Sequence, residues 1–131
     1  MLLLILLSLS NIAFAQTIDA NISGDDSTVY IHQINSNKTI NLDVDGDSAN
    51  IQLEQKDTGT HSITLDVIGD SIDASVLQQG SGSHTATVSL ENAGGPIDFT
   101  LNQSGTTDKS FSASTTCYVA GGCAVLYSQN D

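Results

Sequence analysis

Positive charge is almost absent from this chain of 131 residues, which has three lysines, no arginine and no tryptophan. Fifteen acidic residues bring the formal net charge to −12 at pH 7. Contacts to phosphate groups need clustered cations, so the composition argues against nucleic acids and anionic membranes as partners. The acidic surface keeps an exported chain soluble and attracts cations.

Helical periodicity is also missing. Apolar residues alternate with polar ones, and clusters of Gly, Asp, Asn and Ser separate the alternating stretches. Alternation with a period of two is typical of β-strands, and such polar clusters are typical of turns. The sequence therefore predicts an all-β fold.

No apolar run is long enough to cross a bilayer, which takes about 20 residues. Residues 2–9 are almost wholly apolar and precede Ala13-Phe14-Ala15, a small-x-small pattern ahead of Gln16. No Lys or Arg precedes this run, but the arrangement otherwise predicts a secretory signal peptide at residues 1–15. The mature chain then has no predicted membrane span.

Cysteine is limited to Cys117 and Cys123, which flank the segment Tyr-Val-Ala-Gly-Gly. In an exported protein a close, even pair most often forms a disulfide. A metal site would need two more ligands nearby, and the tail contains none. We expect residues 116–131 to form a disulfide-linked hairpin or cap.

One residue type recurs at a regular interval. Gln33, Gln55, Gln78 and Gln103 each end a short alternating stretch, and they are 22, 23 and 25 residues apart. After each glutamine, a short polar loop leads into a second alternating stretch. A period of about 20–50 residues indicates a repeat architecture.

The repeat unit is a strand, a turn and a second strand, and about four and a half units occupy residues 16–115. One unit cannot bury its apolar face alone, whereas stacked units can. We therefore predict a β-solenoid of two stacked parallel sheets. A β-sandwich of the same short strands is the alternative, although it would not require glutamines in a fixed phase.

Stacking at a strand spacing of about 4.8 Å would align equivalent residues in columns. The glutamines share the phase of the inward apolar residues. A buried, unpaired amide costs about 1–3 kcal/mol, but stacked amides can donate to and accept from one another in a ladder. Four surface glutamines are the alternative. The predicted apolar columns of the first strands are Val29, Ile51, Ala74, Phe99 and Ile31, Leu53, Val76, Leu101.

These units resemble curlin repeats, the building blocks of bacterial curli amyloid fibres. The family's unit is a serine, five residues and a glutamine, followed by a Gly- and Asn-rich turn and a second strand that ends in another glutamine. Ser27 and Gln33 fit the first half directly. The second glutamine is absent, since Val67 and Leu90 hold its place. The resemblance covers roughly residues 17–115.

The resemblance implies a secreted structural protein that polymerises into extracellular surface fibres, for adhesion or a biofilm matrix. It also implies contact with other curli-like subunits and an outer-membrane export apparatus at the surface of a Gram-negative bacterium. The alternative is a monomeric exported adhesin or calcium-binding surface module, whose disulfide tail would cover the last unit.

Nothing in the sequence predicts catalysis, since no nucleophile elbow or phosphate loop is present. His61 and His84 occupy equivalent positions and should stack, either as polar turn residues or as a pair of metal ligands. Stacking would also place aspartates above one another, and cations could relieve their repulsion. The weak candidates for such a calcium site are Asp43, Asp45, Asp47, Asp66 and Asp70.

Overall fold

The computed structural model of the protein describes residues 3–9, 15–34, 37–56, 58–92, 94–118 and 122–131. These ranges contain eleven strands and no helix, as the alternating pattern predicted. The strands are β1 (Leu3–Leu9), β2 (Gln16–Ser23), β3 (Ser27–Gln33), β4 (Lys38–Asp45), β5 (Asn50–Gln55), β6 (His61–Ile68), β7 (Ile72–Leu77), β8 (His84–Asn92), β9 (Ile97–Gln103), β10 (Lys109–Cys117) and β11 (Cys123–Gln129).

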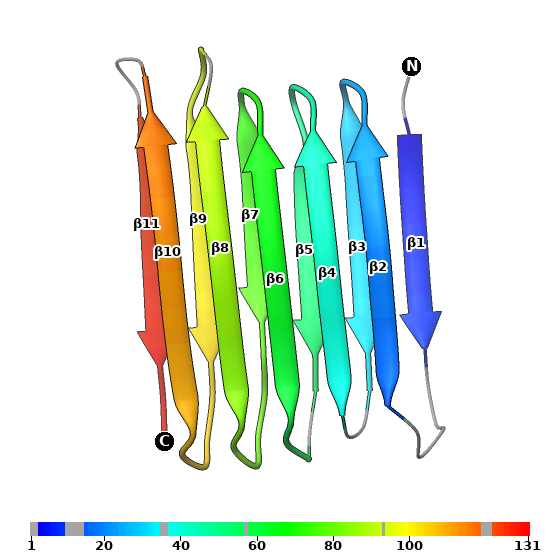
Figure 1. The fold of residues 1–131 in the computed structure, drawn as a ribbon, viewed down its shortest axis with the longest axis vertical. Helices are drawn as coiled ribbons and strands as arrows, with labels where there is room; N and C mark the ends of the chain where they lie inside the picture. The colour runs from blue at the N-terminus through cyan, green and yellow to red at the C-terminus, as the bar shows by residue number, and fades with distance from the viewer. Residues whose placement is uncertain (1–2, 10–14, 35–36, 57, 93, 119–121) are drawn as a thin grey trace.

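The strands alternate between two parallel sheets, so the chain coils as a β-solenoid of about five turns (Figure 1). Sheet A has the strand order β1-β3-β5-β7-β9-β11, and sheet B has the order β10-β8-β6-β4-β2. We number the turns as rungs 1 to 5, from β2–β3 to β10–β11. The predicted solenoid is confirmed, and the parallel pairing differs from the antiparallel sheets of the alternative β-sandwich.

Every strand pairing aligns equivalent residues of successive rungs. Ile40, for example, lies between Ile18 and Ile63, and Leu42 pairs with Leu65. Alternate residues point into the narrow space between the sheets, where the aliphatic side chains of the inner rungs are buried. The core is therefore a set of columns along the solenoid axis, in the phase that the alternation predicted.

Two sharp bends in each rung carry the chain from one sheet to the other. A residue with positive φ ends most of these bends, a conformation that short polar side chains adopt more readily than branched ones. The sequence clusters expected to form turns supply these residues. They are Asp26, Ser48 and Ser71 on one side of the solenoid and Asn37, Thr60, Ser83 and Asp108 on the other, with φ between 52° and 59°.

A glycine begins the bend that follows β2, β4 and β6. Gly24, Gly46 and Gly69 stack so closely that a Cβ on Gly69 would lie 2.1 Å from the carbonyl oxygen of Gly46. Gly69 also has a φ of 147°, which side chains rarely permit. Backbone contact between successive bends therefore requires glycine at positions 46 and 69.

The C-terminal tail forms a regular rung, and part of the predicted leader is paired with rung 1. Residues 116–131 do not form a hairpin or cap, because β10 and β11 lie in different sheets and pair in register with β8 and β9. They complete a fifth rung, and its disulfide is present. At the other end, β1 lies within the predicted leader and pairs with β3. Residues 13 and 14 of the predicted cleavage site lie outside the described ranges.

Gly69→Ala should lower the free energy of unfolding more than Gly24→Ala does. Both substitutions put alanine at an unfavourable φ, which costs about 1–3 kcal/mol. A Cβ on Gly24 meets nothing within 4 Å, so only Gly69→Ala adds a backbone clash, worth about 1–3 kcal/mol more. Urea unfolding followed by circular dichroism measures both losses. Equal losses would contradict the close stacking of the bends.

Candidate assembly interface

The four glutamines of the predicted ladder lie at the C-terminal ends of β3, β5 and β9 and directly after β7. Their side chains point inward, and none of their surface is exposed. Gln55 Nε2 donates a hydrogen bond to Gln33 Oε1 at 2.9 Å. Gln78 Nε2 donates to Gln103 Oε1 at 3.0 Å. The amides therefore connect rung 1 to rung 2 and rung 3 to rung 4.

The glutamine column consists of two hydrogen-bonded pairs and is not a continuous ladder. Gln55 and Gln78 donate in opposite directions along the axis, and each gives its second N–H to sheet B, to the carbonyl oxygens of Ser62 at 3.2 Å and Thr85 at 3.0 Å. Within the described residues, the Oε1 atoms of Gln55 and Gln78 accept no hydrogen bond. The amides thus join the two sheets as well as successive rungs.

Gln129 adds a fifth position to this column. It pairs in register with Gln103 and is exposed, because no rung covers rung 5. The spacing predicted only four members, since the cysteine tail was expected to be a cap. The interval of 26 residues between Gln103 and Gln129 is the signal that would have identified it.

A second polar column, which was not predicted from the sequence, lies on the inward-facing side of sheet B. Its register positions are Gln16, Lys38, His61, His84 and Lys109. Lys38 is fully buried. The sequence signal for this location is its phase, because Lys38 stands two residues before the inward-facing Ile40. The His61 and His84 rings stack as expected, with centroids 4.9 Å apart and planes inclined by 4°.

The environment of His61 favours its neutral form. Its Nε2 atom lies 2.9 Å from the carbonyl oxygen of Lys56 and 3.4 Å from Lys38 Nζ. Burial has the largest effect and lowers the pKa of His61, the hydrogen bond to the Lys56 carbonyl opposes it, and the nearby Lys38 ammonium group lowers the pKa further. The described ranges hold no group of three or more His, Cys, Asp or Glu side chains that could bind a metal ion.

The candidate calcium ligands are divided between two places. Asp47 and Asp70 lie in the bends, where each carboxylate accepts a hydrogen bond from a backbone N–H of the next rung. Asp47 N donates to Asp25 Oδ1 at 3.3 Å, Asp70 N donates to Asp47 Oδ1 at 3.0 Å, and Gly94 N donates to Asp70 Oδ1. These carboxylates therefore stabilise the stacking of the bends.

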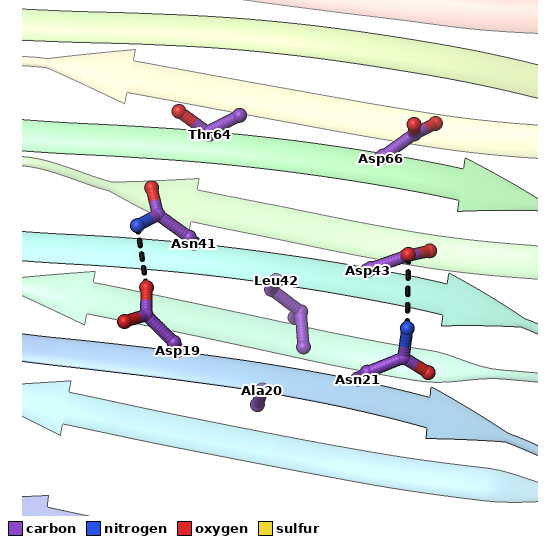
Figure 2. Close-up of a pocket in the computed structure, with 8 residues that line it drawn as sticks. All are labelled: Asp19, Ala20, Asn21, Asn41, Leu42, Asp43, Thr64 and Asp66. Atoms are coloured by element: carbon purple, nitrogen blue, oxygen red, sulfur yellow. Dashed lines mark hydrogen bonds between the residues drawn. The ribbon is translucent and has the colours of Figure 1, made fainter.

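Asp43, Asp45 and Asp66 belong to the exposed outer face of sheet B. Asp43 and Asp66 line a shallow groove there (Figure 2). Asn21 Nδ2 donates to Asp43 Oδ2 at 3.1 Å, and in the neighbouring column an asparagine of rung 2 donates to an aspartate of rung 1. An amide donor of rung 1 thus offsets the charge of Asp43, while Asp43 and Asp66 remain register partners. The structure does not gather the five aspartates into one site.

Rung 5 presents an uncovered apolar face at the C-terminal end. Val125 and Tyr127 face inward by phase but are 37% and 57% exposed, whereas Phe99 and Leu101 below them are buried. Phe111 of β10 is half-buried, and its ring centroid lies 5.2 Å from that of Tyr127. This face is bordered by the free edges of β10 and β11.

The N-terminal end offers the matching edges. β2 is the edge strand of sheet B, and β1 covers β3 in sheet A. In the β1–β3 pairing, Ile5 aligns with Val29 and residue 7 with Ile31. Removal of residues 1–15 would therefore uncover the edge of β3 and its two inward aliphatic side chains.

The two ends are complementary, position by position. One further step of the same register would place β2 of a second copy on β10 and β3 of that copy on β11. Most inward columns would then continue with apolar side chains on apolar ones, and the glutamine column with an amide on an amide. Thr115 would face an isoleucine, and Lys109 would face Gln16. The facing pairs would be Phe111 with Ile18, Ala113 with Ala20, Thr115 with Ile22, Val125 with Val29, Tyr127 with Ile31 and Gln129 with Gln33.

No protein-family model, curated protein or solved structure matches this chain. Within the described ranges, no helix is long and apolar enough to cross a membrane.

Gln55→Leu should lower the free energy of unfolding by about 1–3 kcal/mol, because the buried oxygens of Gln33 and Ser62 lose their donor. Gln52→Leu is the matched control, since Gln52 lies on the same strand but is exposed on its outer face. The control should change stability by no more than about 0.5 kcal/mol. Chemical denaturation measures the free energy of unfolding of both variants. Equal losses would show that the buried amide adds no more stability than an exposed one.

The stability of the fold should decrease as the pH falls through about 6.5, the ordinary pKa of histidine. The pKa of His61 is lowered in the fold, so the unfolded chain binds more protons in this range and stability rises with pH. Urea unfolding at a series of pH values measures the effect. His61→Asn should flatten this part of the profile. A profile unchanged by His61→Asn would contradict the assignment.

Proposed function

We propose that this chain is a secreted structural subunit whose copies add end to end into amyloid-type fibres at the cell surface. The observation that carries the proposal is the match between the face of rung 5 and the β2–β3 face of a second copy. Each junction would continue both sheets, bury apolar residues and extend the glutamine column. Strand addition of this kind gains affinity from backbone hydrogen bonds and specificity from side-chain columns.

Apart from β1, which covers β3, the edge strands of the solenoid have few of the features that usually prevent edge pairing. Natural edge strands are protected by charged residues, proline, bulges or a covering segment. β10 has Lys109 as its one charged residue, β11 has none, and neither strand contains proline. At the other end, β2 has one acidic residue, Asp19, and β3 has none. Once the leader is removed, both ends are open to a second copy.

The acidity of the chain opposes assembly only at long range. At the proposed junction, Asp19 of β2 would lie beside Ser112 of β10, and Tyr30 of β3 would lie beside Leu126 of β11. No two acidic side chains of these strands would face each other. The remaining repulsion comes from the net charge of −12 on each copy, and salt screens such repulsion beyond a Debye length of about 10 Å at 0.1 M.

The proposed location of the protein is the cell surface. The predicted leader at residues 1–15 supports export, and the disulfide is typical of proteins in oxidising compartments. The resemblance to curlin repeats supports an extracellular role in adhesion or a biofilm matrix on a Gram-negative bacterium. Related subunits and an outer-membrane export apparatus would be the partners besides the chain itself.

The purified chain 16–131 should form fibres visible by electron microscopy, with the cross-β spacing of about 4.8 Å along the fibre axis. Raising the salt concentration should shorten the lag before assembly, because it screens the repulsion between copies. Light scattering against time measures the lag. A chain that stays monomeric across salt concentrations would contradict the proposal and favour an exported monomeric module.

Tyr127→Asp should block assembly, since it places a charge in the face that must be buried. Tyr127 is already 57% exposed within one copy, so the fold itself should tolerate the change. Ser128→Asp is the matched control, because the next residue along β11 points to the outer face. Equal inhibition by both variants would show that assembly does not use the inward face of rung 5.

A further inference from the structure

Rung 5 has the weakest packing of the five rungs. In rungs 2 to 4, each inward side chain is covered by a rung on both sides, whereas rung 5 is covered only by rung 4. Ala113 and Thr115 are exposed, although their partners Val88 and Leu90 are buried. β10 and β11 are each paired with a strand of rung 4, and the contact between the Phe111 and Tyr127 rings is the aromatic packing between them. Most of the remaining inward surface of these two strands, which make up the proposed docking face, is exposed.

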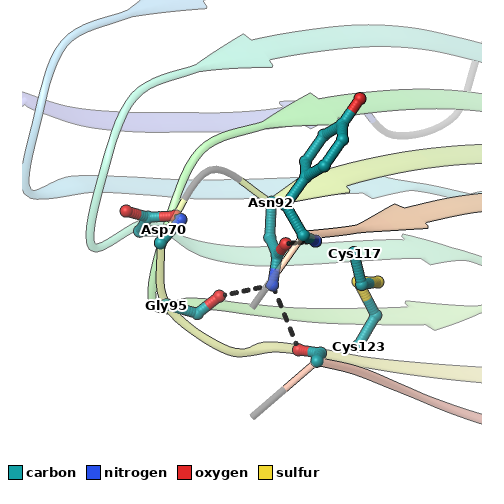
Figure 3. Close-up of a disulfide and its surroundings, with 8 residues drawn as sticks. Asp70, Asn92, Gly95, Cys117 and Cys123 are labelled. Atoms are coloured by element: carbon teal, nitrogen blue, oxygen red, sulfur yellow. Dashed lines mark hydrogen bonds between the residues drawn. A yellow bond between two sulfur atoms is a disulfide. The ribbon is translucent and has the colours of Figure 1, made fainter. Parts of the chain in front are cut away.

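A disulfide between Cys117 and Cys123 links the two strands of this weakly packed rung (Figure 3). Cys117 continues the column of bend glycines, which passes through Asn92 in rung 4, and Cys123 continues the column of Ile97. The two cysteines lie in different sheets, with Cα atoms 6.0 Å apart. The disulfide thus ties sheet A to sheet B at the last bend of the solenoid.

Asn92 holds the same bend from rung 4. Its Nδ2 atom donates to the carbonyl oxygens of Gly95 at 2.8 Å and Gly122 at 3.4 Å, and its Oδ1 atom accepts a hydrogen bond from Tyr118 N at 2.7 Å. These bonds require the chain on both sides of the bend to stay in place. Cys117 is exposed and Cys123 is half-exposed, so a reductant can reach the bond that keeps them there.

We infer that the Cys117–Cys123 disulfide controls assembly by forming the C-terminal docking face, an inference that rests on the proposed end-to-end assembly. When it forms, two Sγ–H bonds break and one Sγ–Sγ bond forms. Two electrons and two protons pass to a disulfide-bearing oxidant, which becomes a dithiol. With both thiols reduced, β10 and β11 separate and the docking face is lost. The chain is then unable to extend itself before it reaches an oxidising compartment.

The control acts at one end of the subunit. β2 and β3 lie four rungs away from the disulfide and share no residue with it. A reduced subunit therefore still adds to the docking face of an oxidised fibre, but it offers no face for the next copy. Reduced subunits are chain terminators.

The test compares oxidised chain 16–131 with the double variant Cys117→Ser/Cys123→Ser. The oxidised chain should assemble, and the variant should stay monomeric over at least a tenfold longer time. Hydrogen exchange should show lost protection in β10 and β11 and retained protection in β4 to β8, which separates loss of the docking face from global unfolding. Added at one tenth of the total subunits, the variant should shorten wild-type fibres. Dithiothreitol should reproduce the variant's behaviour in the wild type and change nothing in the variant.

The possible outcomes distinguish the two proposals. Assembly of the variant at the wild-type rate would overturn control by the disulfide and leave the proposed function intact. If neither protein assembled, the proposed function would fail and the inference with it. If the variant lost protection in every strand, the disulfide would be a general stabiliser and no specific control would exist.

Discussion

In-register hydrogen bonding between each strand and its equivalent in the next rung places like side chains in contact along the whole axis. This pairing makes the core a set of columns. Each side chain must therefore pack against the equivalent side chains of the rungs above and below it. Aliphatic residues pack in such columns readily, because burial of their apolar surface from water is favourable and needs no specific partner. Bend glycines meet it because the backbones of successive bends touch, as the contact between Gly69 and Gly46 shows.

Polar residues inside the solenoid must satisfy their hydrogen bonds along the same axis or across to the other sheet. Gln55 and Gln78 use both directions, donating one N–H to a neighbouring glutamine and the other to a carbonyl group of sheet B. The bend aspartates use the axial direction, accepting the backbone N–H of the next rung. Stacked carboxylates, which would repel one another in isolation, thereby become part of the pairing between rungs.

A stack of this kind has two ends at which pairing stops. Its columns are unfinished at Gln129 and Tyr127 on one side and, beneath β1, at Gln33 and Ile31 on the other. The two ends carry the same columns because every rung repeats them. The similarity of the two end faces is therefore a consequence of the repeat. What distinguishes the ends is how each is held, by strand pairing with β1 at one and by the disulfide at the other.

The sequence by itself determined the class of fold, the inward phase of the apolar residues and the alignment of equivalent positions, because period-two alternation and a repeat of 22 to 25 residues admit few other arrangements. Only the tertiary structure decided that Lys38 lies inside, that the glutamine amides form two pairs, and that the cysteine tail is a rung whose Gln129 extends the column. Each of these depends on what lies across the narrow core or on the next rung. Spacing and phase can assign Lys38 and Gln129 to their columns, but they do not say which groups accept or donate hydrogen bonds there or whether the tail pairs with rung 4.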